Sequence, residues 1–188
     1  MRLILVLLAF AVLPFLSGCL PLVATGVAGA AFSIEDRRTT GTQVEDESIE
    51  RKISWRIGDR FGRDTHVDVT SFNRIVLLAG QVRDEAAKQE VEQMARATEN
   101  VKYVYNELTV GPAASMATHS NDALITSKVK GRFLDAGKFY PNHVKVVSEN
   151  GAVFLMGLVK HKEADDATEI ARSTSGVNRV VRVFEYTD

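Results

Sequence analysis

The chain has 188 residues, of which 45% are hydrophobic and 25% charged, and its formal net charge is −1. This composition is typical of a folded protein with one or two domains and excludes a disordered chain. The balanced charge excludes an overall basic field that attracts nucleic acid, so any charged partner must be recognised by a local patch.

The first residues have the pattern of an export signal. After Arg2, an apolar run from Leu3 to Leu16 is interrupted only by Pro14. The run is shorter than the roughly 20 residues that span a bilayer and fits the core of a signal peptide. It leads into Leu16-Ser17-Gly18-Cys19, which resembles the lipobox of bacterial lipoproteins. The resemblance implies a signal peptide over 1–18 and an N-acyl diacylglyceryl group, with palmitate-type chains, on Cys19; no other cofactor is expected.

Cys19 is the single cysteine of the chain. It therefore has no partner for an internal disulfide, and lipidation accounts for one thiol better than the alternative, an ordinary secretory signal with a stray cysteine. Several acyl chains anchor a protein stably. Leu20 follows instead of the aspartate that would imply retention in the inner membrane. We therefore expect a lipid anchor in the outer membrane, on its periplasmic face, with residues 19–45 as a tether and linker.

The remaining sequence repeats itself at an offset of 76 to 77 residues, which indicates two copies of one domain. The matching blocks, in order, are Ile49, Lys52, Ile53 and Ile57 with Ile125, Lys128, Val129 and Phe133; His66 to Val69 with His143 to Val146; Val76 to Val82 with Val153 to Val159; and Ala95 to Val104 with Ala171 to Val180. We place the copies at 46–110 and 121–188, with a linker at 111–120.

Each copy predicts the order helix, strand, strand, helix, strand. Asp46 and Asp122 are candidate N-caps of the first helices. Two alternating runs, separated by the turn residues 71–73 in the first copy and 148–151 in the second, predict a hairpin. A second helix then leads to a parallel last strand. The expected fold class is α+β, αββαβ in each copy, with a three-stranded mixed sheet covered by two helices. Gly80 and Gly157 lie within strands, where a close neighbouring backbone or helix would explain a glycine.

With these residues in hand, both copies resemble the BON domain, whose hallmark is the segment Leu78-x-Gly80-x-Val82 and its repeat Leu155-x-Gly157-x-Val159. The order lipobox, BON, linker, BON resembles the family of dual-BON outer-membrane lipoproteins, described as division- and outer-membrane-stress-associated lipid-binding proteins. The resemblance implies a non-enzymatic protein of the cell envelope and the division site that maintains outer-membrane integrity. It also implies binding of anionic phospholipid by the second BON domain and association with the β-barrel assembly machinery.

The first helix of the second copy supports a membrane role by its own pattern. Ile125, Val129 and Phe133 form its core stripe, yet Leu124 and Leu134 fall on the opposite side, where a surface helix is normally polar. Apolar residues between lysines are typical of a helix at a membrane interface. The stretch 122–138 carries a net charge of +2. The predicted phospholipid-binding residues are Leu124, Ser127, Lys128, Lys130, Gly131, Arg132, Leu134, Lys138 and Phe139. The alternative is that both leucines pack against the other BON domain.

Other functions have weaker signals. Trp55, the single tryptophan, and Phe72 are candidates for a protein interface, for example with the assembly machinery; partly exposed packing is the alternative for Trp55. The four histidines have no paired spacing, so we expect no metal site. No nucleophile motif or phosphate loop is present, so we expect no catalytic residues, no enzyme activity and no small-molecule substrate.

Overall fold

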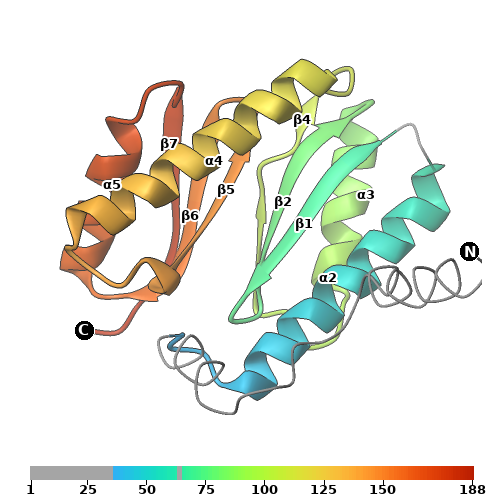
Figure 1. The fold of residues 1–188 in the computed structure, drawn as a ribbon. Helices are drawn as coiled ribbons and strands as arrows, with labels where there is room; N and C mark the ends of the chain where they lie inside the picture. The colour runs from blue at the N-terminus through green and yellow to red at the C-terminus, as the bar shows by residue number, and fades with distance from the viewer. Residues whose placement is uncertain (1–35, 63–64) are drawn as a thin grey trace, which may run out of the picture. The chain divides into compact units, whose positions relative to one another are not determined.

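The computed structural model describes residues 36–62 and 65–188, and residues 35–188 form one compact unit. Cys19 and the expected signal peptide lie outside the described residues. The first copy contains α2 (Thr40–Phe61), β1 (His66–Phe72), β2 (Ile75–Val82), α3 (Glu85–Arg96), β3 (Tyr103–Asn106) and β4 (Thr109–Val110). The second contains α4 (Met116–Ala136), the 3-10 turn η3 (Pro141–His143), β5 (Val144–Glu149), β6 (Ala152–Val159), α5 (His161–Arg172) and β7 (Arg179–Tyr186) (Figure 1). None of the described helices is long and apolar enough to cross a membrane.

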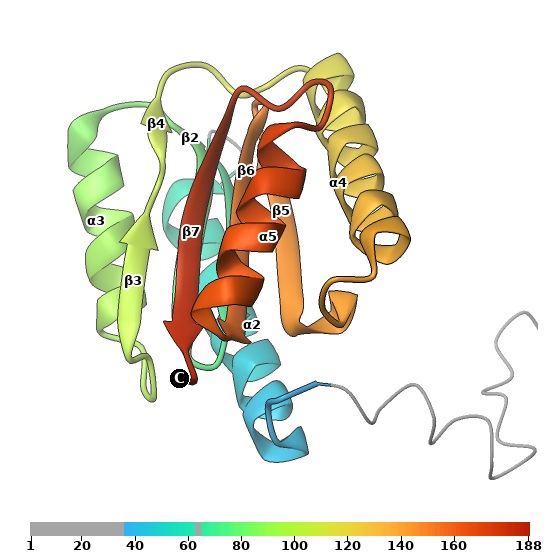
Figure 2. The same ribbon diagram turned by 90° about the vertical axis from the view of Figure 1, so that its left-hand side faces the viewer.

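The α+β class and the αββαβ order are confirmed. In each copy the hairpin strands are antiparallel, and the strand after the second helix pairs parallel to the middle strand. The copies differ in their last strand. In the first copy it is divided into β3 and β4, so that this sheet has four strands, whereas β7 runs unbroken along β6 (Figure 2). The division falls where the buried Leu108 donates its backbone N–H to the Asn106 side chain instead of to the sheet.

Both hairpins turn through two residues with positive φ. Asn73 and Arg74 have φ of 51° and 67°, and Asn150 and Gly151 have φ of 49° and 74°. Two central residues with positive φ match the twist of the flanking strands, and asparagine tolerates this conformation well. The predicted turns are therefore present but shorter than expected, because β1 extends through Phe72 and β5 through Glu149.

The predicted N-caps were wrong. The caps are Thr39 and Ser115, each seven residues earlier, whose side chains accept from the backbone N–H of Thr42 and Thr118. Asp46 and Asp122 lie inside the helices and are almost fully buried. Their carboxylates accept backbone N–H groups of the hairpin turns instead, from Asn73 and Arg74 for Asp46 and from Asn150 and Gly151 for Asp122. Each aspartate thus connects the first helix of its copy to the hairpin turn by hydrogen bonds.

The stretches expected as linkers are partly helical, because the capping residues lie earlier than the first apolar stripe. Residues 40–45 belong to α2 and residues 116–120 to α4. The segment before α2 is also fixed to the domains. Arg38 pairs with Asp36 and Asp46 and lies 3.9 Å above the Phe72 ring, and Arg37 pairs with Glu163 of the second copy.

Each sheet packs its two helices on one face. Ile49, Ile53 and Val91 meet alternate residues of β2 in the first core, and the second copy has the same arrangement. The opposite faces of the two sheets share a third apolar cluster, formed by Phe72, Leu77, Ala79, Ala152, Phe154, Met156 and Val183. The two copies therefore pack sheet against sheet, with the helices on the outer faces.

The strand glycines have the close neighbours that the sequence predicts. A Cβ atom at Gly80 would collide with the backbone carbonyl of His66, and one at Gly157 with that of His143. The backbone at the start of β1, and at the end of η3 just before β5, approaches the middle strand too closely at these positions for any side chain. The backbone of His66 therefore lies directly against β2, and the backbone of His143 lies directly against β6.

Candidate lipid-binding surface

Helix α4 has apolar residues on two opposite sides. Ile125, Val129 and Phe133 are fully buried against the second sheet, whereas Leu124 and Leu134 are 59% and 68% exposed. The alternative that both leucines pack against the other BON domain is wrong, because that contact is made by the sheet faces and leaves α4 outside. Two large aliphatic side chains thus remain in solvent on one helix.

The residues between the two leucines keep this surface open and positive. Ser127, Lys128 and Lys130 are exposed, and Gly131 is partly exposed with no atom within 4 Å of its missing Cβ. Among the described residues, neither lysine forms an ion pair. Free ammonium groups beside exposed leucines are the combination that an anionic lipid surface attracts.

The assignment of Arg132 and Phe139 is corrected, because neither belongs to the row of exposed side chains; Phe139 contributes only a mostly buried wall of the hollow described below. Arg132 reaches across to α5, where it donates to the carbonyl of Ile170 and to the Thr174 hydroxyl. Phe139 is 8% exposed and packs edge-on against Phe133 in the core, with ring centroids 5.0 Å apart. Gly137 ends α4 in the left-handed conformation and reverses the chain, which turns the next aromatic side chain inward.

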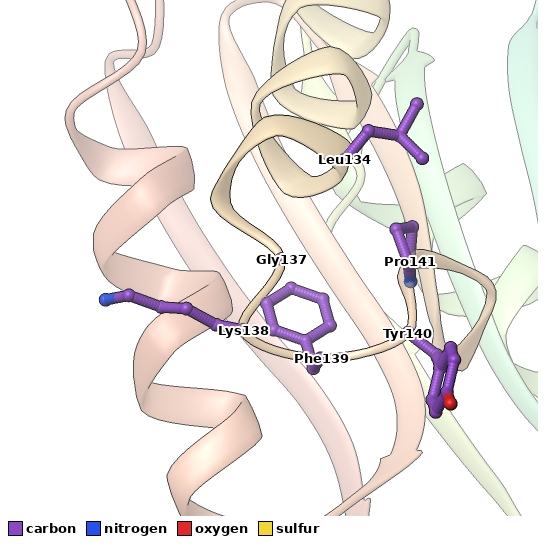
Figure 3. Close-up of a pocket in the computed structure, with 6 residues that line it drawn as sticks. All are labelled: Leu134, Gly137, Lys138, Phe139, Tyr140 and Pro141. Atoms are coloured by element: carbon purple, nitrogen blue, oxygen red, sulfur yellow. The ribbon is translucent and has the colours of Figure 1, made fainter.

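Lys138 is exposed but already partnered. Its ammonium group lies 3.0 Å from Asp166 of α5, and Figure 3 shows it extending toward that helix, away from Leu134 and Tyr140. Hydrogen bonds from Lys162 and from Lys138 hold the pKa of Asp166 below its ordinary value. The charge of Lys138 is therefore largely matched within the protein, and Lys128 and Lys130 carry most of the local positive charge.

The structure adds a hollow of about 460 Å³ beside the end of α4, which the sequence reasoning did not identify (Figure 3). Its lining residues are Leu134, Gly137, Lys138, Phe139, Tyr140 and Pro141. Tyr140 is 56% exposed, so an aromatic ring stands at its edge. The signal was available in the Gly137 and Pro141 that flank two aromatic residues, since such residues turn the chain back toward the helix.

The first copy presents a different surface. Trp55 is 72% exposed on α2, whereas Phe72 is 4% exposed in the cluster between the sheets. Phe72 therefore packs between the two copies, and its assignment to an interface with an external protein was wrong. Trp55 stays a candidate.

The expectation that the histidines are isolated was wrong for two of them. The rings of His66 and His119 lie 4.6 Å apart between centroids, although the residues are 53 positions apart in the sequence. His119 is on the first turn of α4, which the expected linker had placed outside any element.

Comparisons with known proteins agree with the repeat. The model of the BON domain family matches residues 45–112 and 121–188. The chain is 42% identical to the outer membrane lipoprotein DolP of Haemophilus influenzae, over 93% of this chain and 91% of that protein. It is 34% identical to a 21 kDa hemolysin of Actinobacillus pleuropneumoniae, over 80% and 79% of the two chains. It is 29% identical to the osmotically inducible protein Y of Escherichia coli, over 74% and 72%. The expected outer-membrane location agrees with the first of these relatives.

Proposed function

This chain belongs to the BON domain family, and we propose that it is a non-catalytic outer-membrane lipoprotein that binds anionic phospholipid through α4. The lipid on Cys19 holds it on the periplasmic face, and the second BON domain contacts the membrane to support envelope integrity. The observation that carries the proposal is the exposure of Leu124 and Leu134 on a helix whose other side forms the core, beside Lys128 and Lys130, which form no ion pair within the part of the chain that the structure describes.

The free energies of burying leucine and of placing lysine near anionic lipid favour contact of α4 with the membrane over exposure to solvent. Full burial of a leucine side chain contributes about 1.5–3 kcal/mol, and each lysine near an anionic surface contributes about 1 kcal/mol. Two leucines and two lysines therefore supply binding of useful strength when an acyl anchor already holds the protein near the bilayer. The hollow beside Tyr140 extends the same surface beyond the helix end.

Vesicle flotation of residues 35–188 tests the proposal without the anchor, because all three described cores lie in this unit. We expect flotation with phosphatidylglycerol vesicles, much less with neutral phosphatidylcholine, and a decrease with added salt. The double variant Leu124→Asp, Lys128→Glu should bind about tenfold or more weakly. Equal flotation with both lipids would contradict the proposal.

The repeat supplies a matched control. Ser48 and Lys52 occupy the positions of Leu124 and Lys128 in α2. The double variant Ser48→Asp, Lys52→Glu introduces the same side chains in the other copy and should float like the unmodified protein. Equal loss in both double variants would point to overall charge and not to the α4 surface.

A second candidate function rests on Trp55. A tryptophan that is 72% exposed on α2 is the kind of anchor on which protein interfaces depend, and an assembly factor for β-barrel proteins is the partner that the family suggests. Photo-crosslinking from position 55 in cells tests this function. A crosslinked protein supports it, and crosslinks to lipid alone reject it.

A further inference from the structure

The histidine pair lies next to a buried carboxylate, at the junction of the two BON copies. His66 begins β1 in the first copy, His119 is on the first turn of α4, and Glu149 ends β5 in the second copy. One possible ligand atom from each residue lies within 4.8 Å of the other two. Two imidazoles and a carboxylate from three separate elements thus converge on one point.

Glu149 is buried without a cation. It is 7% exposed, and within residues 36–62 and 65–188 it forms no ion pair. Its recorded partner is the neutral amide of Gln81, which donates to Oε1 over 2.6 Å. Arg179 lines the same small hollow but pairs with Glu107 at 2.9 Å. A buried carboxylate is normally paired with a positive charge, and no lysine or arginine of the described residues forms an ion pair with this one.

His66 provides a second, independent sign. Its Nε2 atom is buried and, among the described residues, has no hydrogen-bond partner. Buried polar atoms of this kind are rare in folded proteins and are explained by a missing ligand, ion or water. The close approach of Gly80 to the backbone of His66 fixes the position from which this side chain extends.

We infer that His66, His119 and Glu149 bind a divalent transition-metal ion, for which Zn²⁺ is the best match, at the junction of the two BON copies. Imidazole nitrogen and carboxylate oxygen are common zinc ligands, with bonds of about 2.0–2.2 Å. Ligand atoms around such an ion lie about 3.5 Å apart, so the three side chains must close by about 1 Å or slightly more. The Gln81 amide, which also accepts from the backbone N–H of Ala114, orients Glu149 as an outer partner.

The ion would connect parts of the chain that are otherwise joined by the sheet-to-sheet cluster. One ligand belongs to the first copy, one to the helix that presents Leu124, and one to the second copy. Metal binding would therefore hold α4 and both sheets in one arrangement. This inference is independent of lipid binding, since none of the three ligands lies on the exposed lipid surface.

Metal titration of the full chain in detergent, purified without a polyhistidine tag, tests the site. We expect one Zn²⁺ per chain by calorimetry, and Co²⁺ in its place should give the visible absorption of a four-coordinate ion. His66→Ala, His119→Ala and Glu149→Gln should each weaken binding at least tenfold. His161→Ala is the matched control, because His161 is exposed and outside the cluster, and should bind like the unmodified chain.

The thermal stability of the protein provides a second test, because weak binding of Zn²⁺ to exposed side chains should not change the Tm. Zn²⁺ should raise the Tm of the unmodified chain, because a ligand that binds the folded state stabilises it. The rise should be absent in His119→Ala, whose partly exposed position permits folding. Binding that survives His119→Ala, or that His161→Ala also abolishes, would overturn the site, and so would the absence of stoichiometric binding by the unmodified chain.

Discussion

The Arg37 guanidinium holds the Glu163 carboxylate with two hydrogen bonds, of 2.7 and 2.8 Å, and so joins the segment before the first BON copy to the second copy. Arg37 also donates to the backbone carbonyl of Leu158. The segment that precedes α2 is therefore fixed to the second copy, the one that carries the proposed lipid-binding surface.

This pair predicts a pH-dependent stability. Hydrogen bonding by Arg37 holds the pKa of Glu163 below its ordinary value of 4.5 despite partial burial. A carboxyl whose pKa is lower in the folded state stabilises the fold above the unfolded pKa, and this contribution is lost as the pH falls through the folded pKa. Urea unfolding at about pH 7 and about pH 3.5 should therefore show a smaller loss of stability in Arg37→Ala than in the unmodified protein.

Arg172→Ala is the control for this prediction. Arg172 pairs with Glu169 on the surface of α5, where both side chains are largely exposed, and exposed pairs contribute little. Its loss of stability between the two pH values should equal that of the unmodified protein. An unchanged pH dependence in Arg37→Ala would show that the contact does not persist in solution.

Asp122 should be essential for the second hairpin. Replacing it with alanine leaves the backbone N–H groups of Asn150 and Gly151 without their acceptor in a buried turn. We expect Asp122→Ala to lower the free energy of unfolding by about 2–4 kcal/mol. Asp135→Ala, at an exposed position of the same helix, should change it by less than about 0.5 kcal/mol. Chemical denaturation measures both, and equal effects would refute the role of Asp122.

The strand and helix glycines should respond in opposite directions. Gly157→Ala forces a Cβ atom against the His143 carbonyl and should cost about 2 kcal/mol or more. Gly58 lies inside α2, and apart from its chain neighbours and the nearby backbone of the helix no atom lies within 4 Å of where a Cβ would be. Gly58→Ala should therefore stabilise the protein by about 0.5–1 kcal/mol. Thermal unfolding distinguishes the two, and tolerance of Gly157→Ala would contradict the close approach of the strands.

The sequence was sufficient for the fold because its signals are local and occur twice. Alternation in the strands, the helical stripes and the turn residues at Asn73 and Asn150 all agree between the copies. The N-caps were misplaced because Asp46 and Asp122 precede the apolar stripe as caps often do. The available clue was that Asp46 lies 27 residues before Asn73 and Asp122 lies 28 residues before Asn150, so that both aspartates stand at nearly the same distance from a turn.

The candidate site was only partly predictable, because some of its residues are placed by local patterns and others by contacts between distant elements. Leu124 and Leu134 could be placed outside from the helical period alone. The inward turn of Phe139 depends on the left-handed Gly137, and the reach of Arg132 depends on where α5 packs. The meeting of His66 with His119 depends on the packing of one copy against the other, which no spacing within the sequence encodes.

The central claim is that α4, and not α2, enters the lipid surface. Amide NMR signals of residues 35–188, recorded with phosphatidylglycerol bicelles that contain a nitroxide-labelled lipid, test it residue by residue. We predict selective broadening at Leu124, Ser127, Leu134 and Tyr140, with Trp55 and its neighbours in α2 unaffected. Broadening centred on Trp55, or uniform weak broadening over both copies, would contradict the account.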